Sequence, residues 1–242
     1  MRHFDIASRD RDRVTVLGSV TPAANVGVSL SVAAGKDDYL ESLFGLRDNT
    51  HRVYAAGIDF TPTEHVVLGM SYSSERYNAL SRSRQANPGV QFTDPSRNWA
   101  TDATDRVHTW LLNAEIGRIA DKVDLRFNDE FSRARAHCDY ITGPVADRTL
   151  PEEVIVSTTL PTPVELPPTL SELQRGTMDV TYALLSHLSL GLSYWYERYR
   201  VNDFTLDADA NPDLARGQAL LMGYLHRPYT ANTVWGRLIY RW

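Results

Sequence analysis

The chain has 242 residues, a formal net charge of −5 and 43% hydrophobic residues. The mild acidity and the lack of a Lys/Arg-rich face argue against nucleic acid as a partner. No stretch approaches the roughly 18 to 20 consecutive apolar residues of a membrane-spanning helix, and a single cysteine, Cys138, excludes an internal disulfide framework and a CxxCH haem-attachment motif.

Apolar and polar side chains alternate along most of the chain, with the period of two residues that is typical of β-strands. In residues 25–36, Val28, Leu30 and Val32 face one way, whereas Ser29 and Ser31 face the other. Each predicted strand spans roughly 9 to 14 residues, long enough to cross a bilayer at a tilt. In chain order, strands are predicted at 11–20, 25–35, 51–61, 65–76, 105–117, 121–135, 174–186, 188–201, 215–227 and 230–242.

The connections between these strands alternate between short and long. Outer-membrane barrels have short periplasmic turns and longer extracellular loops, whereas a soluble β-domain has no reason to sort its connections in this way. The sequence therefore predicts an all-β fold, an antiparallel transmembrane β-barrel segment of about ten strands that forms one domain over residues 1–242. Short turns are predicted at 21–25, 61–65, 117–122, 186–188 and 228–230, and extracellular loops at 36–50, 77–104, 136–173 and 202–214.

The polar faces of the predicted strands carry charged residues that cannot form a dry core. In a transmembrane barrel this face lines the lumen, and in a soluble sheet it would be the solvated outer face. We expect the first, with these residues as contacts to a partner or to the pore. The predicted lumen-facing residues are Asp59, Glu75, Glu115, Asp124, Arg126, Glu130, Asp179, Glu197, Arg237 and Arg241.

The last predicted strand, 230–242, is amphipathic and ends on an aromatic residue. Leu238, Tyr240 and Trp242 resemble the C-terminal signal that the barrel-insertion machinery of outer membranes reads, although an edge strand of a soluble sheet could also stop at Trp. Aromatic residues gather near other strand ends too, among them Tyr72 and Trp110, which is typical of girdles at the two membrane interfaces.

The sequence contains no pattern that predicts catalysis or metal binding. The seven histidines are dispersed, with His65 and His187 in predicted turns, and neither a GxSxG elbow nor a Walker loop nor a GxGxxG turn is present. We therefore expect no enzyme, no metal and no cofactor bound by this chain. Cys138 falls in a predicted long loop and is interpreted as incidental.

Several stretches resemble the MtrB/PioB family of outer-membrane barrels. They are RDRDRVTVLGSVTP (9–22), RNWATDATDRVHT (97–109), LPPTL (166–170), LSLGLSYWYERYRVNDF (188–204) and GYLHRPYTANTVWGRLIYRW (223–242). The resemblance implies location in the cell outer membrane and a large barrel of more than twenty strands. It also implies a periplasmic multihaem cytochrome c as partner, which carries the haem and passes electrons across the outer membrane.

The N-terminal sequence MRHFDIASRDRDRV is charged and lacks the apolar region of a secretory signal. We therefore expect the C-terminal part of a larger barrel, whose signal peptide and first strands lie elsewhere. Barrel size agrees with this expectation, because ten strands close at about 20 Å in diameter and twenty-six at about 50 Å. Of these two barrels, the wider one has room for a folded cytochrome.

Two alternatives share parts of this pattern. A general diffusion porin for ions or small solutes has the same architecture but needs no cytochrome. A soluble β-barrel that binds a small ligand would have the opposite facing, with an apolar interior and a polar surface.

Overall fold

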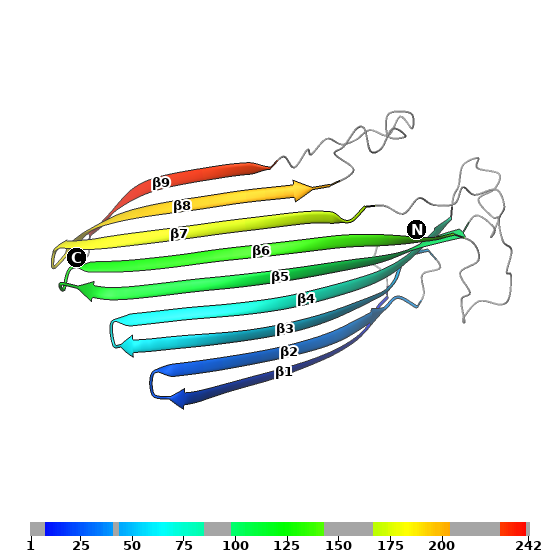
Figure 1. The fold of residues 1–242 in the computed structure, drawn as a ribbon, viewed down its shortest axis with the longest axis horizontal. Helices are drawn as coiled ribbons and strands as arrows, with labels where there is room; N and C mark the ends of the chain where they lie inside the picture. Colours follow the sequence, from blue (N-terminus) through cyan, green and yellow to red (C-terminus); the bar gives the residue numbers. More distant parts are fainter. Residues whose placement is uncertain (1–7, 41–43, 85–97, 143–166, 204–227, 241–242) are drawn as a thin grey trace.

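The computed structural model of the protein describes residues 8–40, 44–84, 98–142, 167–203 and 228–240, which form nine antiparallel strands in one sheet (Figure 1). Each strand pairs with the next along the chain, in the order β1 to β9. No helix among these residues is long and apolar enough to cross a membrane. The strands are β1 (Asp10–Ala23), β2 (Val26–Asp38), β3 (Gly45–Thr63), β4 (Val66–Arg84), β5 (Asn98–Ile119), β6 (Val123–Thr142), β7 (Thr169–Leu185), β8 (Leu188–Asn202) and β9 (Tyr229–Tyr240).

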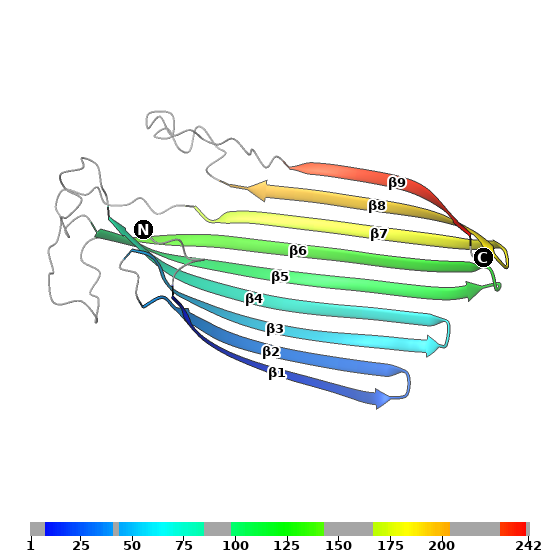
Figure 2. The same ribbon diagram turned by 180° about the vertical axis from the view of Figure 1, so that it is seen from behind.

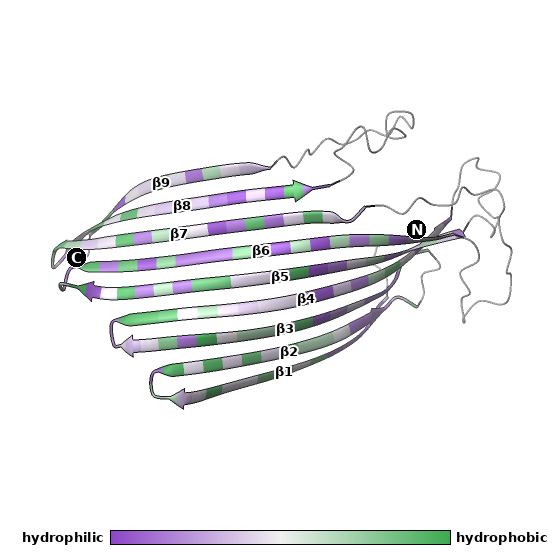
Figure 3. Cartoon of the chain, viewed as in Figure 1, coloured by the Kyte–Doolittle hydropathy of each residue, from purple (hydrophilic) through white to green (hydrophobic). Residues whose placement is uncertain are grey.

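The pairing register gives the sheet an apolar and a polar face. Val32 lies opposite Val16 and Tyr54 on its neighbouring strands, and residues opposite each other share a face. The next residue, Ser31, lies on the other face with Ala55. Figure 3 shows this alternation of hydropathy along the strands, and the predicted facing of residues 25–36 is therefore confirmed.

The sheet is curved (Figures 1 and 2), and the closer burial of small side chains on the polar face indicates that this face is the concave one. Curvature crowds side chains on the inner side of a sheet and spreads them on the outer side. On the polar face Ala33 and Ser193 are 6% and 1% exposed, whereas Val16 and Leu30 on the apolar face are 63% and 58% exposed. Among the described residues β1 and β9 do not pair with each other, so the sheet is open.

Four short turns lie at one end of the sheet (Figure 1), where they were predicted. The first two share the pattern Thr-Pro followed by three residues and Val, with prolines at 22 and 62. Both prolines fall where the ladder is irregular, between Val20 and Ala23 and between Phe60 and Thr63. Proline has no N–H to donate, so it is tolerated at such an irregular position.

The strands extend further into the predicted loops than the alternation indicated. β3 begins at Gly45, β4 continues to Arg84, and β5 begins at Asn98, so the predicted loop boundaries at 36–50 and 77–104 were wrong. The boundary at 136–173 was wrong as well, because β6 continues to residue 142 and β7 begins at residue 169. Backbone pairing needs no alternation of side chains, and alternation is lost wherever neither face meets an apolar environment.

The last hairpin also differs from its prediction. Tyr199 pairs with Tyr229 and Leu188 with Tyr240, so β8 and β9 are direct neighbours. The predicted short turn at 228–230 was therefore wrong, because β9 begins at Tyr229, at the end opposite the four short turns. The strand predicted at 215–227 lies outside the described residues, as does most of the loop predicted at 202–214.

Candidate functional site

The concave polar face brings together the charged residues that the sequence singled out. Nine of the ten lie on this face by the pairing register, and Arg241 lies outside the described residues. Two charged clusters form among them, on the strands from β6 to β9.

The first cluster is centred on Arg175 of β7. Its Nε lies 2.8 Å from Oε2 of Glu197, and one terminal nitrogen lies 3.7 Å from Oε2 of Glu130. The guanidinium carbon lies 5.6 Å from the ring centroid of Trp195, and the Tyr229 hydroxyl donates a hydrogen bond to Glu197. Four strands thus contribute to one network, which fixes large side chains on the inner wall.

The second cluster joins β7, β8 and β9 near the short turns. One terminal nitrogen of Arg237 lies 3.6 Å from Oδ1 of Asp179 and donates to the Thr181 hydroxyl at 3.3 Å. The nearly buried Ser193 hydroxyl donates to the same Asp179 oxygen. These side chains are therefore largely engaged with one another.

The remaining predicted charges have looser contacts. Glu115 and Arg126 face each other at 3.8 Å but are more than half exposed, and Glu75 accepts a hydrogen bond from the Tyr77 hydroxyl at 2.6 Å. Asp59 lies opposite Gly27 and Gly69. Asp124 accepts a hydrogen bond within the turn between β5 and β6.

That turn joins β5 to β6 and holds three non-glycine residues with positive φ. Arg118, Ala120 and Asp121 have φ of 53°, 50° and 59°. These values lie in the left-handed region, which residues other than Gly, Asn and Asp rarely adopt. The Asp124 carboxylate accepts a hydrogen bond from the Arg118 backbone N–H at 3.0 Å. Asp124 therefore stabilises the turn.

A different part of the concave face, over the middle of β1 to β4, carries mostly side chains no larger than serine, with Leu17 of the edge strand β1 as the exception. Ser29, Gly57 and Ser71 lie opposite one another in one row of the register, and a hollow of about 410 Å³ opens there. The alternation predicts which face these residues lie on, but it does not predict a patch, because their small size matters only where the register brings them together. The small-residue patch consists of Ser19, Ser29, Ser31, Ala33, Ala55, Gly57, Gly69, Ser71 and Ser73.

The apolar face carries an aromatic row. The Trp110 ring centroid lies 5.2 Å from that of Tyr72 and 5.6 Å from that of Phe131, so three neighbouring strands contribute one ring each. The Tyr72 hydroxyl is hydrogen-bonded to Nδ1 of His108 at 2.8 Å. Other aromatic residues of the predicted girdles lie on the polar face instead, as Trp195 in the middle of β8 does, so the girdle prediction applies to only part of the aromatic set.

Several further predictions can be placed. Leu238 and Tyr240 lie on the apolar face and Trp242 lies outside the described residues, so the insertion signal stays a prediction. His65 and His187 occupy turns as predicted. Cys138 lies in β6 opposite Ala103 and not in a loop, because β6 is longer than expected. Within the described ranges no group of three or more His, Cys, Asp or Glu residues could hold a metal ion.

Comparisons with known proteins place these features in context. A family model described as "Putative outer membrane beta-barrel porin, MtrB/PioB" matches residues 1–242. No curated protein matches the chain. Among solved structures, "Copper transporter OprC" is 12% identical with a TM-score of 0.62, over 95% of this chain and 33% of that one. At this identity the likeness shows the fold alone, and the chain spans about a third of the transporter's length.

Proposed function

Because the chain belongs to the MtrB/PioB family of outer-membrane β-barrels, we propose that it forms part of a barrel wall that encloses a periplasmic multihaem c-type cytochrome. In this role the chain binds no haem and catalyses no reaction. It separates the partner from lipid, orients it, and so allows electrons to cross the outer membrane along the partner's haems.

The membrane determines what each face of the sheet contacts. In outer-membrane barrels the apolar band faces lipid, the polar face lines the lumen, and the short turns are periplasmic. The concave polar face of this sheet is thus the lumenal wall, and the four short turns lie on the periplasmic side.

The small-residue patch is the observation that carries the proposal. A pore for small solutes gains selectivity from side chains that project into its lumen. Within the area of the patch Leu17 is the one large side chain among the described residues, and Ser29, Gly57 and Ser71 leave the backbone accessible. A folded protein can approach a wall of this kind closely, since small residues allow two backbones to come together.

The width of the barrel also supports an enclosed protein. The nine described strands do not close, and a barrel of nine strands would be only about 17 Å across, at roughly 6 Å of circumference per strand. The sheet superposes on about a third of a much longer outer-membrane chain. This curvature fits a barrel of more strands and a wider lumen.

Site-directed crosslinking tests the proposal with matched positions on the two faces. In a Cys138→Ser background, Ser31→Cys and Ser71→Cys place a thiol on the lumenal patch. Leu30→Cys and Met70→Cys, their chain neighbours, place one on the lipid face. The protein is purified from its own outer membrane, after treatment with a short thiol-to-amine crosslinker.

We expect a crosslinked band that stains for haem with the two lumenal variants and not with the two lipid-facing ones. Haem should also co-purify with the wild-type barrel in a fixed ratio. A barrel without haem that conducts ions in planar bilayers would contradict the proposal and favour the diffusion porin.

A further inference from the structure

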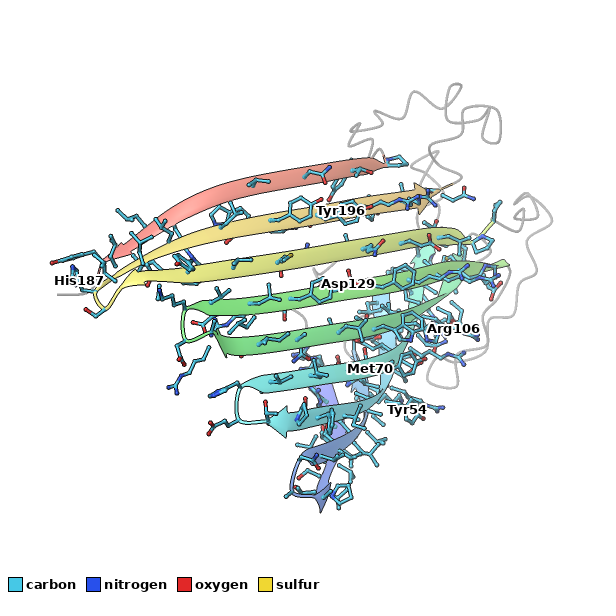
Figure 4. All side chains as sticks on the ribbon, turned by 60° about the vertical axis from the view of Figure 1, so that its left-hand side comes forward. Tyr54, Met70, Arg106, Asp129, His187 and Tyr196 are labelled. Atoms are coloured by element: carbon cyan, nitrogen blue, oxygen red, sulfur yellow. The ribbon has the colours of Figure 1, made fainter. Side chains whose placement is uncertain are left out.

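Four arginines lie side by side on the lipid-facing side of the sheet. Arg52 pairs with Arg76, Arg76 with Arg106, and Arg106 with Arg135, so this arginine ladder crosses β3, β4, β5 and β6. All four are exposed, and Figure 4 labels Arg106. Like charges directly opposite each other destabilise a sheet, which means that the ladder needs a source of negative charge.

The height of the ladder places it at the outer edge of the apolar band. On β4 the lipid-facing residues run from Val66 near the periplasmic turn through Tyr72 to Arg76. Ten residues at about 3.4 Å each and a tilt of about 40° put Arg76 about 26 Å above Val66. The apolar band of an outer-membrane barrel is about 25 Å tall, so the ladder lies at the headgroups of the outer leaflet, four residues beyond the aromatic row along each strand.

The protein itself offers these arginines little negative charge. On the strands of the ladder, the acids of the same face lie four residues further along, at Asp48, Asp102 and Asp139, which is about 13 Å along each strand. Glu172 on β7 lies nearer to Arg135, but it is paired with Arg133 at 3.5 Å. Among the described residues no ion pair joins the ladder to an acid, and Asp139 is paired with His137 at 2.9 Å. The counter-charge must come mostly from outside the described sheet.

A hollow of about 580 Å³ lies at the ladder, with space for such a group. Arginine forks suit phosphate oxygens, which they can bind through two parallel hydrogen bonds. Beyond the ladder lie neutral polar residues, including Asn78, whose amide donates to the Thr104 hydroxyl at 2.7 Å. The hollow is lined by Arg76, Thr104, Arg106, Arg135, His137, Asp139, Pro167 and Pro168.

We propose that the arginine ladder binds the phosphate groups of a phosphorylated glycolipid in the outer leaflet. Arginines on adjacent strands are about 5 Å apart, so the ladder is long enough to hold two phosphates of one headgroup. Sugar hydroxyls then meet Thr104 and Asn78. This inference depends on the orientation of the barrel in the membrane and not on the enclosed cytochrome.

Lipid binding by matched charge-removal variants tests the proposal. The barrel is purified from its outer membrane, delipidated in detergent, and titrated with bisphosphorylated lipid A, dephosphorylated lipid A or phosphatidylglycerol. Each arginine near an anionic surface contributes roughly a fivefold factor in affinity. We expect R76Q/R106Q to bind bisphosphorylated lipid A about thirtyfold more weakly than the wild type. The control R118Q/K122Q, with the same loss of charge at a periplasmic turn, should bind like the wild type.

Equal binding by R76Q/R106Q and the wild type would overturn the proposal. So would equal binding of the dephosphorylated lipid, or of phosphatidylglycerol, because the ladder would then not select a phosphorylated glycolipid. Folding is checked by the shift in electrophoretic mobility on heating. If R76Q/R106Q does not fold, the single variant R135Q replaces it. We expect R135Q to bind bisphosphorylated lipid A about fivefold more weakly than the wild type. Unchanged binding by R135Q would overturn the proposal.

Discussion

The strands β1 to β4 and the strands β6 to β9 build two different walls from one pattern of alternation. Inside the barrel, the first region carries the small-residue patch, whereas the second carries large charged and aromatic side chains around Arg175. Outside, the apolar band of the first region is continuous, but in the second Asp129 lies between Phe127 and Phe131 and opposite Gly176 (Figure 4). Alternation thus decides which way a side chain faces, and side-chain size decides what can approach the wall.

The largest expected effect comes from adding bulk to the small-residue patch. Ser71→Trp should lower the amount of the proposed cytochrome partner that co-purifies at least fivefold, because a large side chain inserted into a packed contact costs about 1 to 3 kcal/mol. Haem absorbance per barrel measures this effect. Leu111→Trp is the control, since Leu111 lies opposite Ser71 on the same face and is already bulky. Equal losses in both variants would remove the distinction between the two regions.

In the charged region, Arg175→Gln should reduce stability rather than partner binding. The change leaves Glu197, which is 15% exposed, without its cation, and we expect a loss of about 1.5 kcal/mol in the free energy of unfolding. Urea titration of the barrel in vesicles measures it. Arg126→Gln removes an exposed pair and should cost less than about 0.5 kcal/mol. R175Q/E197Q should recover part of the loss, and failure to do so would mean that the pair does not act as a unit.

On the lipid face, Asp129→Leu should stabilise the second region. An acidic side chain in the apolar band costs less than the roughly 2 to 4 kcal/mol of Lys or Arg at the midplane, so we expect a gain of about 1 kcal/mol in the same unfolding experiment. Asp59→Leu, on the lumenal face, should give no such gain. A loss of stability in Asp129→Leu would show that this carboxylate has a partner in the assembled barrel.

The smallest effect is expected from Gly57→Ala within the patch. The added Cβ would lie 2.8 Å from the Ser29 hydroxyl oxygen, and that hydroxyl can rotate away. Stability and cytochrome retention should therefore both stay within about 0.5 kcal/mol of the wild type. A large loss of cytochrome would mean that the contact depends on the bare glycine backbone rather than on a generally flat wall.

The facing of the strands was predictable, but their ends were not. Residues such as Val28 and Ser29 are sorted by lipid on one side and a wet lumen on the other, and this sorting leaves a period of two in the sequence. Residues 77–82 pair on both sides with neighbouring strands yet lie beyond the apolar band, where nothing sorts their side chains. Residues 215–227 alternate like a strand but lie outside the described residues, so that prediction stays untested.

The candidate site was predictable in its charges but not in its shape. Polar positions such as Glu130 and Glu197 stood out because a charged residue within an alternating strand is conspicuous. Their meeting at Arg175 depends on the register across β6, β7 and β8, which no local pattern records. The arginine ladder likewise exists only through register, because Arg52 and Arg135 are far apart in the sequence.

The continuation of the strands past the membrane has a consequence for dynamics. From Arg76 to Arg84 the strand β4 rises about 20 Å above the headgroups, with β3 and β5 bonded to it on either side over most of that length. Amide protons in this wall should therefore exchange slowly with solvent, although water surrounds them, because exchange requires the ladder to open. To a molecule arriving from outside, the barrel presents a stiff raised rim.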